Sequence, residues 1–503
     1  MKKNNGLQWV LAISLGLVIH SCNSGGSGSP KSGAAPEVTE IPAYSNSKDA
    51  QSSFREGMAA LDLGDFTKAR TLFTKAIQLD SSFGTAYLMK ANTATSAKEY
   101  ADDIMSGKSH LDSASNWEKM YGEYLATNLA GDRIKGIGIL EKIAAAYPKA
   151  ARAQVDLAAA YSDNNQLDKA RAGYQKAVEL DPEWTGAYTG MINDYLFNEP
   201  KDLKKAQESA LKLVVMAPAS SGAAITLGDC YRAQNDFSKA KEAYAKAVQL
   251  DGSAAAAYYK EGHANTYLGN FDEARKNYMD AGKRDVSPSF SILNIAYTYL
   301  YGGDSKTAMK VLTDGAAKLD SSGNTPGKMV NEKSNCFTSA ANIAEHYGDA
   351  SALKQLVAKI EPLNEQVFND LGTAEGKIFG KADLLGWQAR IAIAEGKLDE
   401  AKAKAEDMKS VLASIKDDRK DEDYHYLMGV ISMRQKNFPD AIAHLEKGDR
   451  NRIYIKYLMA RANEAGGNKD KATALYKEVA AYNFNDIGNA LVRNEVRKKL
   501  GMM

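Results

Sequence analysis

The sequence holds few side chains whose type and spacing could support catalysis. Residues 106–109, Ser-Gly-Lys-Ser, are similar to the end of a phosphate-binding loop, but that loop also requires a glycine where this chain has Asp102. The patterns HExxH, CxxC and GxSxG do not occur. The six histidines show no spacing typical of metal ligands: they are His20, His110, His263, His346, His425 and His444. We therefore expect a protein that is not an enzyme and that binds neither a cofactor nor a metal.

Cys22 follows a segment whose pattern indicates covalent modification of the cysteine and not catalysis. A positively charged start is followed by an apolar run from Trp9 to Ile19, which is too short to cross a membrane and is typical of a secretory signal peptide. The next residues, Ile-His-Ser-Cys at 19–22, resemble the lipobox of bacterial lipoproteins. The resemblance implies a signal peptide over residues 1–21, cleavage before Cys22, and acylation of that cysteine. An ordinary signal peptide that is cut elsewhere is the alternative.

Residues 22–48 are expected to form a flexible tether behind the lipid. This stretch is rich in glycine, serine and proline, and it cannot bury enough apolar surface to fold. A flexible coil of this length reaches roughly 25–30 Å on average. The residue after the cysteine is not aspartate, and no acidic run follows it. We therefore expect an outer-membrane lipoprotein that faces the periplasm.

The charge balance narrows the classes of partner. The chain has 64 Lys and Arg against 63 Asp and Glu, and its formal net charge is +1. Such a chain has no overall field that would attract nucleic acid or an anionic membrane surface. The composition suits helices better than strands, because alanine, lysine, leucine and glutamate recur throughout. The expected partners are therefore proteins, and the expected link to a membrane is the lipid alone.

Beyond the tether, the sequence repeats itself. The segments LGDFTKARTLFTKAIQLD (63–80), NQLDKARAGYQKAVELDP (165–182) and QNDFSKAKEAYAKAVQLD (234–251) share alanine, aromatic and alanine residues at the same positions. The first of these alanines recurs at a spacing of 34 to 36 residues, at Ala170, Ala206, Ala240, Ala274 and Ala308. A period of 34 with this pattern resembles the tetratricopeptide repeat (TPR) family, whose unit is two helices joined by a turn.

The resemblance implies an all-α fold, a right-handed superhelical solenoid of about twelve helix-turn-helix units with a polar-faced capping helix over residues 483–503. We place the array over residues 49–320, with a degenerate unit at 84–116, a loop insertion at 321–335, and an irregular array over 336–482. The units are expected to begin near residues 50, 84, 117, 151, 187, 221, 255, 289, 334, 382, 422 and 453. Cys230 and Cys336 then lie too far apart for a disulfide and are expected to be buried.

The resemblance also implies where a partner would bind. In TPR proteins the first helix of each unit lines a concave groove, and the matching positions hold Tyr259, His263, Tyr267, Phe290, Tyr297, Tyr301, Asn193, Asp229 and Arg232. Several of the aromatic residues stand four positions apart, so they share a helix face. Exposed aromatic side chains in a groove are good anchors for a ligand. The alternative, which the sequence leaves open, is that these tyrosines pack between neighbouring helices.

The function expected from these features is that of a membrane-anchored adaptor for protein partners whose identity the sequence does not give. The main alternative is a glycan- or peptide-binding envelope lipoprotein of a nutrient uptake system. Starch-uptake binding proteins also combine an acylated cysteine with TPR helices, but they carry large irregular insertions, whereas this chain stays repetitive nearly throughout. An enzyme is the third possibility, and the failed search for catalytic motifs disfavours it.

Overall fold

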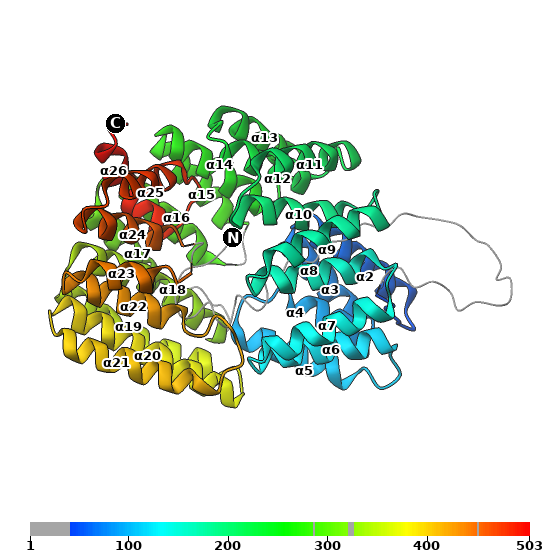
Figure 1. Ribbon diagram of the computed structural model, residues 1–503. Coiled ribbons are helices and arrows are strands. Elements are labelled where there is room, and N and C mark those ends of the chain that lie inside the picture. Colours follow the sequence, from blue (N-terminus) through cyan, green and yellow to red (C-terminus); the bar gives the residue numbers. More distant parts are fainter. Residues whose placement is uncertain (1–40, 285–286, 320–325, 450–451, 503) are drawn as a thin grey trace.

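The structure is a computed structural model that describes residues 41–284, 287–319, 326–449 and 452–502 of the 503-residue chain. The predicted signal peptide, Cys22 and most of the tether lie outside the described residues. The described residues form 25 α-helices, numbered α2 to α26, and one short 3₁₀ helix, η3 (Leu412–Ser414), without any strand (Figure 1). The part of the chain that the structure describes is therefore all-α, as expected.

The helices form twelve helix-turn-helix units in series, followed by α26 (Ile487–Lys499). The first helices of the units are α2 (Lys48–Asp62), α4 (Gly84–Ala91), α6 (Asn116–Leu129), α8 (Ala151–Asp163), α10 (Thr185–Phe197), α12 (Ser221–Ala233), α14 (Ala255–Leu268), α16 (Pro288–Tyr301), α18 (Pro326–Tyr347), α20 (Ala374–Ala394), α22 (Glu422–Arg434) and α24 (Ile453–Ala465). The second helices are α3 (Phe66–Leu79), α5 (Ala97–Ser109), α7 (Arg133–Ala146), α9 (Leu167–Leu180), α11 (Leu203–Met216), α13 (Phe237–Leu250), α15 (Phe271–Gly282), α17 (Ser305–Lys318), α19 (Ala350–Asn369), α21 (Leu398–Val411), α23 (Phe438–Leu445) and α25 (Lys469–Ala481).

The unit boundaries predicted from the repeat agree with the structure in most places. The first helices of ten units begin within about two residues of the expected positions, and the degenerate unit has the shortened α4. The prediction of a loop over 321–335 was wrong from residue 326 onward, because α18 begins there, at Pro326. The missing N–H and the fixed φ of proline suit the first turn of a helix.

Within a unit, the close approach of the two helices depends on a small residue opposite an aromatic ring. A Cβ atom added at Gly262 in α14 would lie 2.5 Å from the ring of Tyr278 in α15, and Gly228 in α12 bears the same relation to Tyr244 in α13. Both tyrosines are buried. The turn between the helices is also specified locally, because Asp236 caps α13 by accepting a hydrogen bond from a backbone N–H in its first turn.

The array winds into a superhelix whose end returns to its own middle (Figure 1). Helix α26 packs on α24 and α25, as a capping helix should, and it also contacts α16 and α18. The loop between α21 and α22 reaches the N-terminal units: Arg133 pairs with Asp417 at 3.0 Å, and the side-chain amide of Asn164 donates to Asp418 at 3.2 Å. The described part of the chain is therefore closed on itself and is not an open spiral.

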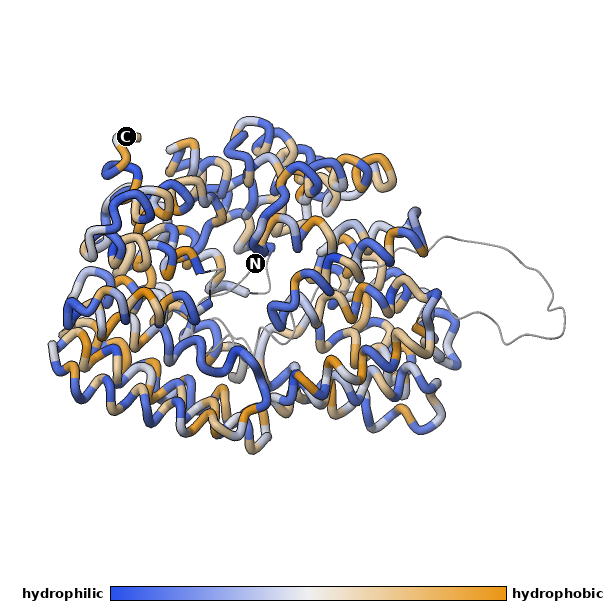
Figure 2. The backbone as a smooth tube through the Cα atoms, viewed as in Figure 1, coloured by the Kyte–Doolittle hydropathy of each residue, from blue (hydrophilic) through white to orange (hydrophobic). Residues whose placement is uncertain are grey.

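Hydrophobic residues lie mainly along the packed sides of the helices, and hydrophilic residues lie along the outer sides (Figure 2). Cys230 and Cys336 are buried free thiols, as predicted. Among the described residues, no helix combines the length and the apolar character that a membrane span requires. The same residues contain no group of three or more His, Cys, Asp or Glu side chains placed to hold a metal ion.

Candidate partner-binding groove

The predicted groove residues lie on the first helices of four consecutive units. Asn193 is on α10, Asp229 and Arg232 are on α12, and the aromatic set is divided between α14 and α16. The first helices of neighbouring units contact one another along the inner side of the superhelix. The inner faces of α12, α14 and α16 form one continuous surface, which we call the inner groove. Asn193 is half-buried one unit away, outside the cleft described below.

The chain's own residues 482–499, here called the C-terminal segment, cover the inner groove. The Asn485 amide donates to Nδ1 of His263 at 3.2 Å. One helical turn further on, Asn489 donates to the hydroxyl of Tyr267 at 2.9 Å. The guanidinium of Arg493 lies 4.8 Å from the centre of the Tyr267 ring. A segment of the same chain therefore lies on the surface where a partner was predicted to bind.

The aromatic side chains of the inner groove are packed rather than open. Tyr259 is 3% exposed, and its ring meets that of Phe290 edge to face at 4.4 Å between centres. Tyr297 is 8% exposed, and its hydroxyl lies 3.5 Å from that of Ser339 in α18. Tyr301 is 7% exposed, and its backbone carbonyl accepts a hydrogen bond from Asn494 at 2.7 Å. A partner-binding role for these rings stays a prediction, because their visible contacts are all within the chain.

A buried charged cluster fixes one end of the inner groove. Asp229 accepts hydrogen bonds from Lys260 and from Tyr244, each at 2.6 Å, and pairs with Arg232 at 3.2 Å. Burial opposes ionisation of Asp229, but the two positive charges outweigh it and hold its pKa below the ordinary value. Burial, with the same two cations, lowers the pKa of His263 well below its usual range. The imidazole is therefore neutral at pH 7, so that Nδ1 can accept hydrogen bonds.

A cleft of about 700 Å³ opens beside this cluster. One wall contains Arg232, Lys260 and His263 from the inner groove. The opposite wall comes from α24 and α25 and from the extended start of the C-terminal segment. The turn between α10 and α11 closes one side with Glu199 and Lys201. Residues from units five, six, seven and twelve therefore meet around a single hollow.

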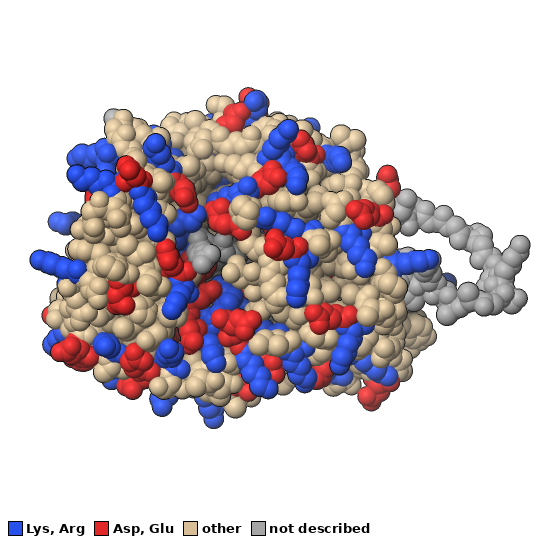
Figure 3. Space-filling view, in the orientation of Figure 1, with Lys and Arg blue, Asp and Glu red and all other residues tan. Residues whose placement is uncertain are grey.

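The walls of the cleft carry both signs of charge in close alternation. Lys456 pairs with Glu478 at 2.8 Å and, across the cleft, with Glu199 at 3.1 Å. Lys201 pairs with Glu199 at 3.6 Å. Figure 3 shows basic and acidic side chains side by side around the central hollow of this face. The cleft therefore favours a ligand that is itself polar and of mixed charge over a polyanion or a hydrocarbon.

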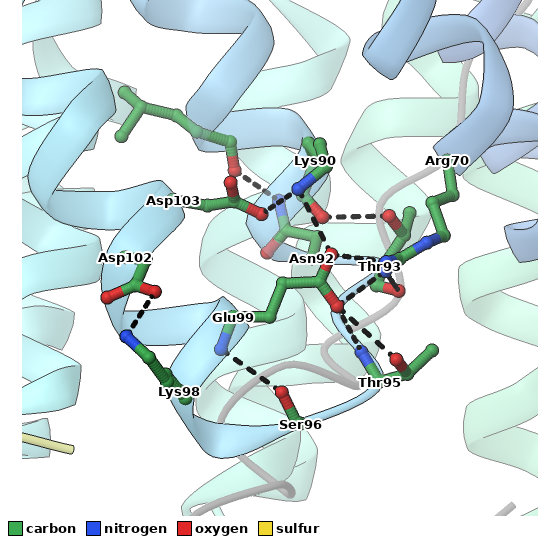
Figure 4. A network of polar contacts seen from close by, with 11 residues as sticks. Arg70, Lys90, Asn92, Thr93, Thr95, Ser96, Lys98, Glu99, Asp102 and Asp103 are labelled. Carbon is green, nitrogen blue, oxygen red and sulfur yellow. Dashed lines mark hydrogen bonds and ion pairs between the residues drawn. The ribbon is translucent and has the colours of Figure 1, made fainter. Parts of the chain in front are cut away.

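A second polar network joins the first two units around the short helix α4 (Figure 4). Glu99 in α5 pairs with Arg70 of α3 and with Lys90 of α4, the latter at 3.0 Å. Lys90 also reaches Asp103 at 2.6 Å. Burial raises the pKa of Asp103 to about 6, against the opposing charge of Lys90. Because its charged members pair with one another, we assign the network to packing of the degenerate unit.

Comparison with protein-family models matches the description "tetratricopeptide repeat" to residues 54–116, 151–183, 222–254 and 255–285. These segments are tetratricopeptide repeats. The last two include α12 and α14, so TPR units supply much of the inner groove. A comparison with curated proteins gave no match.

Solved structures with similar arrays include several TPR proteins. YrrB, described as a TPR protein with an unusual peptide-binding site, is 23% identical over 39% of this chain and 97% of its own, with a TM-score of 0.27. MamA is 22% identical over 33% of this chain and 95% of its own, with a TM-score of 0.27. Yeast Tom70 is 14% identical over 91% of this chain and 90% of its own, with a TM-score of 0.34.

The TPR pattern did not reveal the opposite wall of the cleft or the occupant of the groove. Glu199 and Lys456 are 257 residues apart, and a repeat predicts contacts only between neighbouring units. One sequence signal was present for the occupant. Asn485, Asn489 and Arg493 recur every fourth residue, which places three hydrogen-bonding side chains on one side of the last helix and its approach. In the structure, that side contacts the TPR-like units.

Proposed function

We propose that this protein is a scaffold that binds polypeptide partners in its central cleft while held at the bacterial cell envelope by a lipid on Cys22. The observation that carries the proposal is the cleft of about 700 Å³, whose walls come from four TPR-like units and from the C-terminal segment. A site assembled from several units is suited to an extended ligand, which touches each wall in turn.

The chemistry of the cleft supports a polypeptide as that ligand. Lysine and glutamate side chains alternate around it, and Gln234 and Asn235 add exposed amides that both donate and accept hydrogen bonds. A peptide carries backbone amides and side chains of either charge, so it can satisfy such a surface. The proposal assigns no catalytic step to the protein.

The anchoring half of the proposal rests on the N-terminal sequence. The short apolar run, the lipobox-like tetrapeptide and the Gly/Ser-rich stretch after Cys22 support attachment to the outer membrane by acyl chains, with the array in the periplasm. Metabolic labelling with a fatty-acid analogue tests this half. Label on the wild type and none on Cys22→Ser supports the lipid, and equal labelling of both overturns it.

The binding half is tested by crosslinking in intact cells from two positions. A photo-reactive amino acid replaces Gln234, which is exposed and lines the cleft, or Val215, which is 79% exposed on α11 and lies outside it. We expect discrete envelope proteins to be captured from position 234 and not from position 215. The same captured proteins at both positions, or none at position 234, would contradict binding in the cleft.

A further inference from the structure

Four asparagines of the C-terminal segment contact successive TPR-like units of the inner groove. Asn483 donates to the backbone carbonyl of Ala233 at 3.3 Å, at the end of α12. Asn485 donates to His263 in α14 and, at 2.7 Å, to the side-chain oxygen of Asn294 in α16. Further along the groove, the Asn489 amide donates to the hydroxyl of Tyr267, and the Asn494 amide donates to the backbone carbonyl of Tyr301. One type of side chain therefore makes the direct hydrogen bonds along the whole groove.

The groove atoms that accept hydrogen bonds from these asparagines are all uncharged oxygen or nitrogen atoms. They are the carbonyl oxygens of Ala233 and Tyr301, the amide oxygen of Asn294, the neutral ring of His263 and the hydroxyl of Tyr267. A primary amide suits such a row, because its NH₂ group donates two hydrogen bonds without bringing a charge into a buried place. The inner groove is therefore specific for amide side chains.

The groove satisfies the hydrogen-bonding groups of the resident segment only in part. Oδ1 of Asn485 and Oδ1 of Asn489 are buried, and neither accepts a hydrogen bond from the described residues. A buried acceptor without a partner is unfavourable, and hydrogen bonds between neutral groups contribute little net stability because both groups regain water on release. The polar contacts between the segment and the groove are therefore replaceable by those of another amide-bearing segment.

We propose that the inner groove is a binding site for asparagine-bearing peptide segments and that the C-terminal segment is its resident occupant. A partner protein with asparagines at the same spacing would displace the segment and take its place. This inference rests on the proposed scaffold function and names the class of partner. It also predicts that the groove is closed until such a partner arrives.

The test uses the full chain and a synthetic peptide that spans residues 481–499. The cis segment is tethered and thus present at a high effective concentration, so it must first be weakened. The double variant Asn485→Ala/Asn489→Ala removes its two central amides, whereas Asn369→Ala makes the same substitution at an exposed position of α19 and serves as the control. We expect the double variant to bind the labelled peptide at least about tenfold more tightly than the wild type or the control.

Two further measurements keep the proposal open to contradiction. A peptide with alanine in place of Asn485, Asn489 and Asn494 should bind at least about tenfold more weakly, and equal binding would overturn the amide specificity. In wild-type protein, hydrogen exchange in α26 should occur by local opening, and the unaltered peptide should speed it. Exchange of α26 only through global unfolding would overturn release, even if the double variant does not fold. Neither result depends on capturing an envelope partner, so the scaffold proposal can fail separately.

Discussion

Glu99 shows how one carboxylate can stabilise a degenerate unit. Burial alone would raise its pKa, but hydrogen bonds from Arg70 and Thr95, with the charges of Arg70 and Lys90, lower that pKa to about 2. The ionised form therefore stabilises the fold fully above about pH 4.5, and this contribution is lost as the pH falls toward 2. We expect Glu99→Gln to reduce the free energy of unfolding by about 2–3 kcal/mol at pH 7, measured by urea denaturation.

A neighbouring ion pair provides the control for this prediction. Asp102 pairs with Lys98 at 2.7 Å within the same helix, but both side chains are about half exposed (Figure 4). Asp102→Asn should therefore change the free energy of unfolding by less than about 0.5 kcal/mol. The difference between the two variants should shrink below pH 4.5. A Glu99→Gln variant as stable as Asp102→Asn at pH 7 would show that the network in Figure 4 does not hold the unit together.

Substitution of two tyrosines in the inner groove distinguishes a packing role from a partner-binding role. If Tyr259 and Tyr297 were open anchors, truncation to alanine would abolish partner capture and leave the melting temperature nearly unchanged. Their burial leads to the opposite expectation, because removing a buried ring leaves a cavity. We expect each substitution to lower the free energy of unfolding by about 3–5 kcal/mol, measured by denaturant titration. Either variant with wild-type stability would restore the reading of these rings as a binding surface.

At the scale of the elements, the helix pair depends on its small residues. A Cβ atom at Gly228 in α12 would overlap the ring of Tyr244 in α13, whereas one at Gly138 in α7 meets nothing within 4 Å. We expect Gly228→Leu to cost about 1–3 kcal/mol or more and to open units five to seven first, as seen by hydrogen exchange. Gly138→Leu should be neutral or slightly stabilising, because leucine favours helix over glycine. Uniform protection across the array of the Gly228 variant would contradict this description.

The elements were predictable because each unit is specified within its own 34 residues. The alanines, the ring at Tyr174 or Tyr244, and the capping aspartate at Asp236 act on immediate neighbours, so reading the sequence placed ten unit starts closely. Where α18 and α20 are longer, at 22 and 21 residues, the repeat no longer fixed the boundary, and both helices begin earlier than expected. The errors therefore lie where the local pattern is weakest.

At the scale of the whole molecule, closure of the superhelix depends on contacts between units that are far apart in the array. Arg133 meets Asp417 and Lys456 meets Glu199, in each case joining an N-terminal unit to a C-terminal one. We expect Arg133→Ala/Lys456→Ala to raise the radius of gyration, measured by small-angle X-ray scattering, because the superhelix can then open. The control Lys204→Ala/Lys310→Ala removes exposed pairs within single helices and should leave the radius unchanged. A double variant as compact as this control would show that the polar bridges are not needed for closure.

The repeat predicted the surface of the candidate site but not the segment that covers it, because the repeat specifies contacts only between neighbouring units. The register of the repeat placed His263, Tyr267 and Tyr301 on one surface, and the structure brings them together. The C-terminal segment that covers this surface lies 191 to 250 positions further along the sequence. No periodicity relates the segment to the surface. Contacts of this length follow from the accumulated curvature of twelve units, to which every unit adds a small rotation.

The separation between the inner groove and its covering segment sets an order of events during synthesis. Each TPR-like unit can fold as soon as its own 34 residues have emerged, because its contacts are local. The final covering of α14 and α16 must wait for Asn485 and the residues after it, which are made later than all twelve units. A chain that ended before Tyr482 would present a nearly full set of folded units with a bare inner wall. Until residues 482–499 have been made, the inner sides of α14 and α16 therefore stay uncovered.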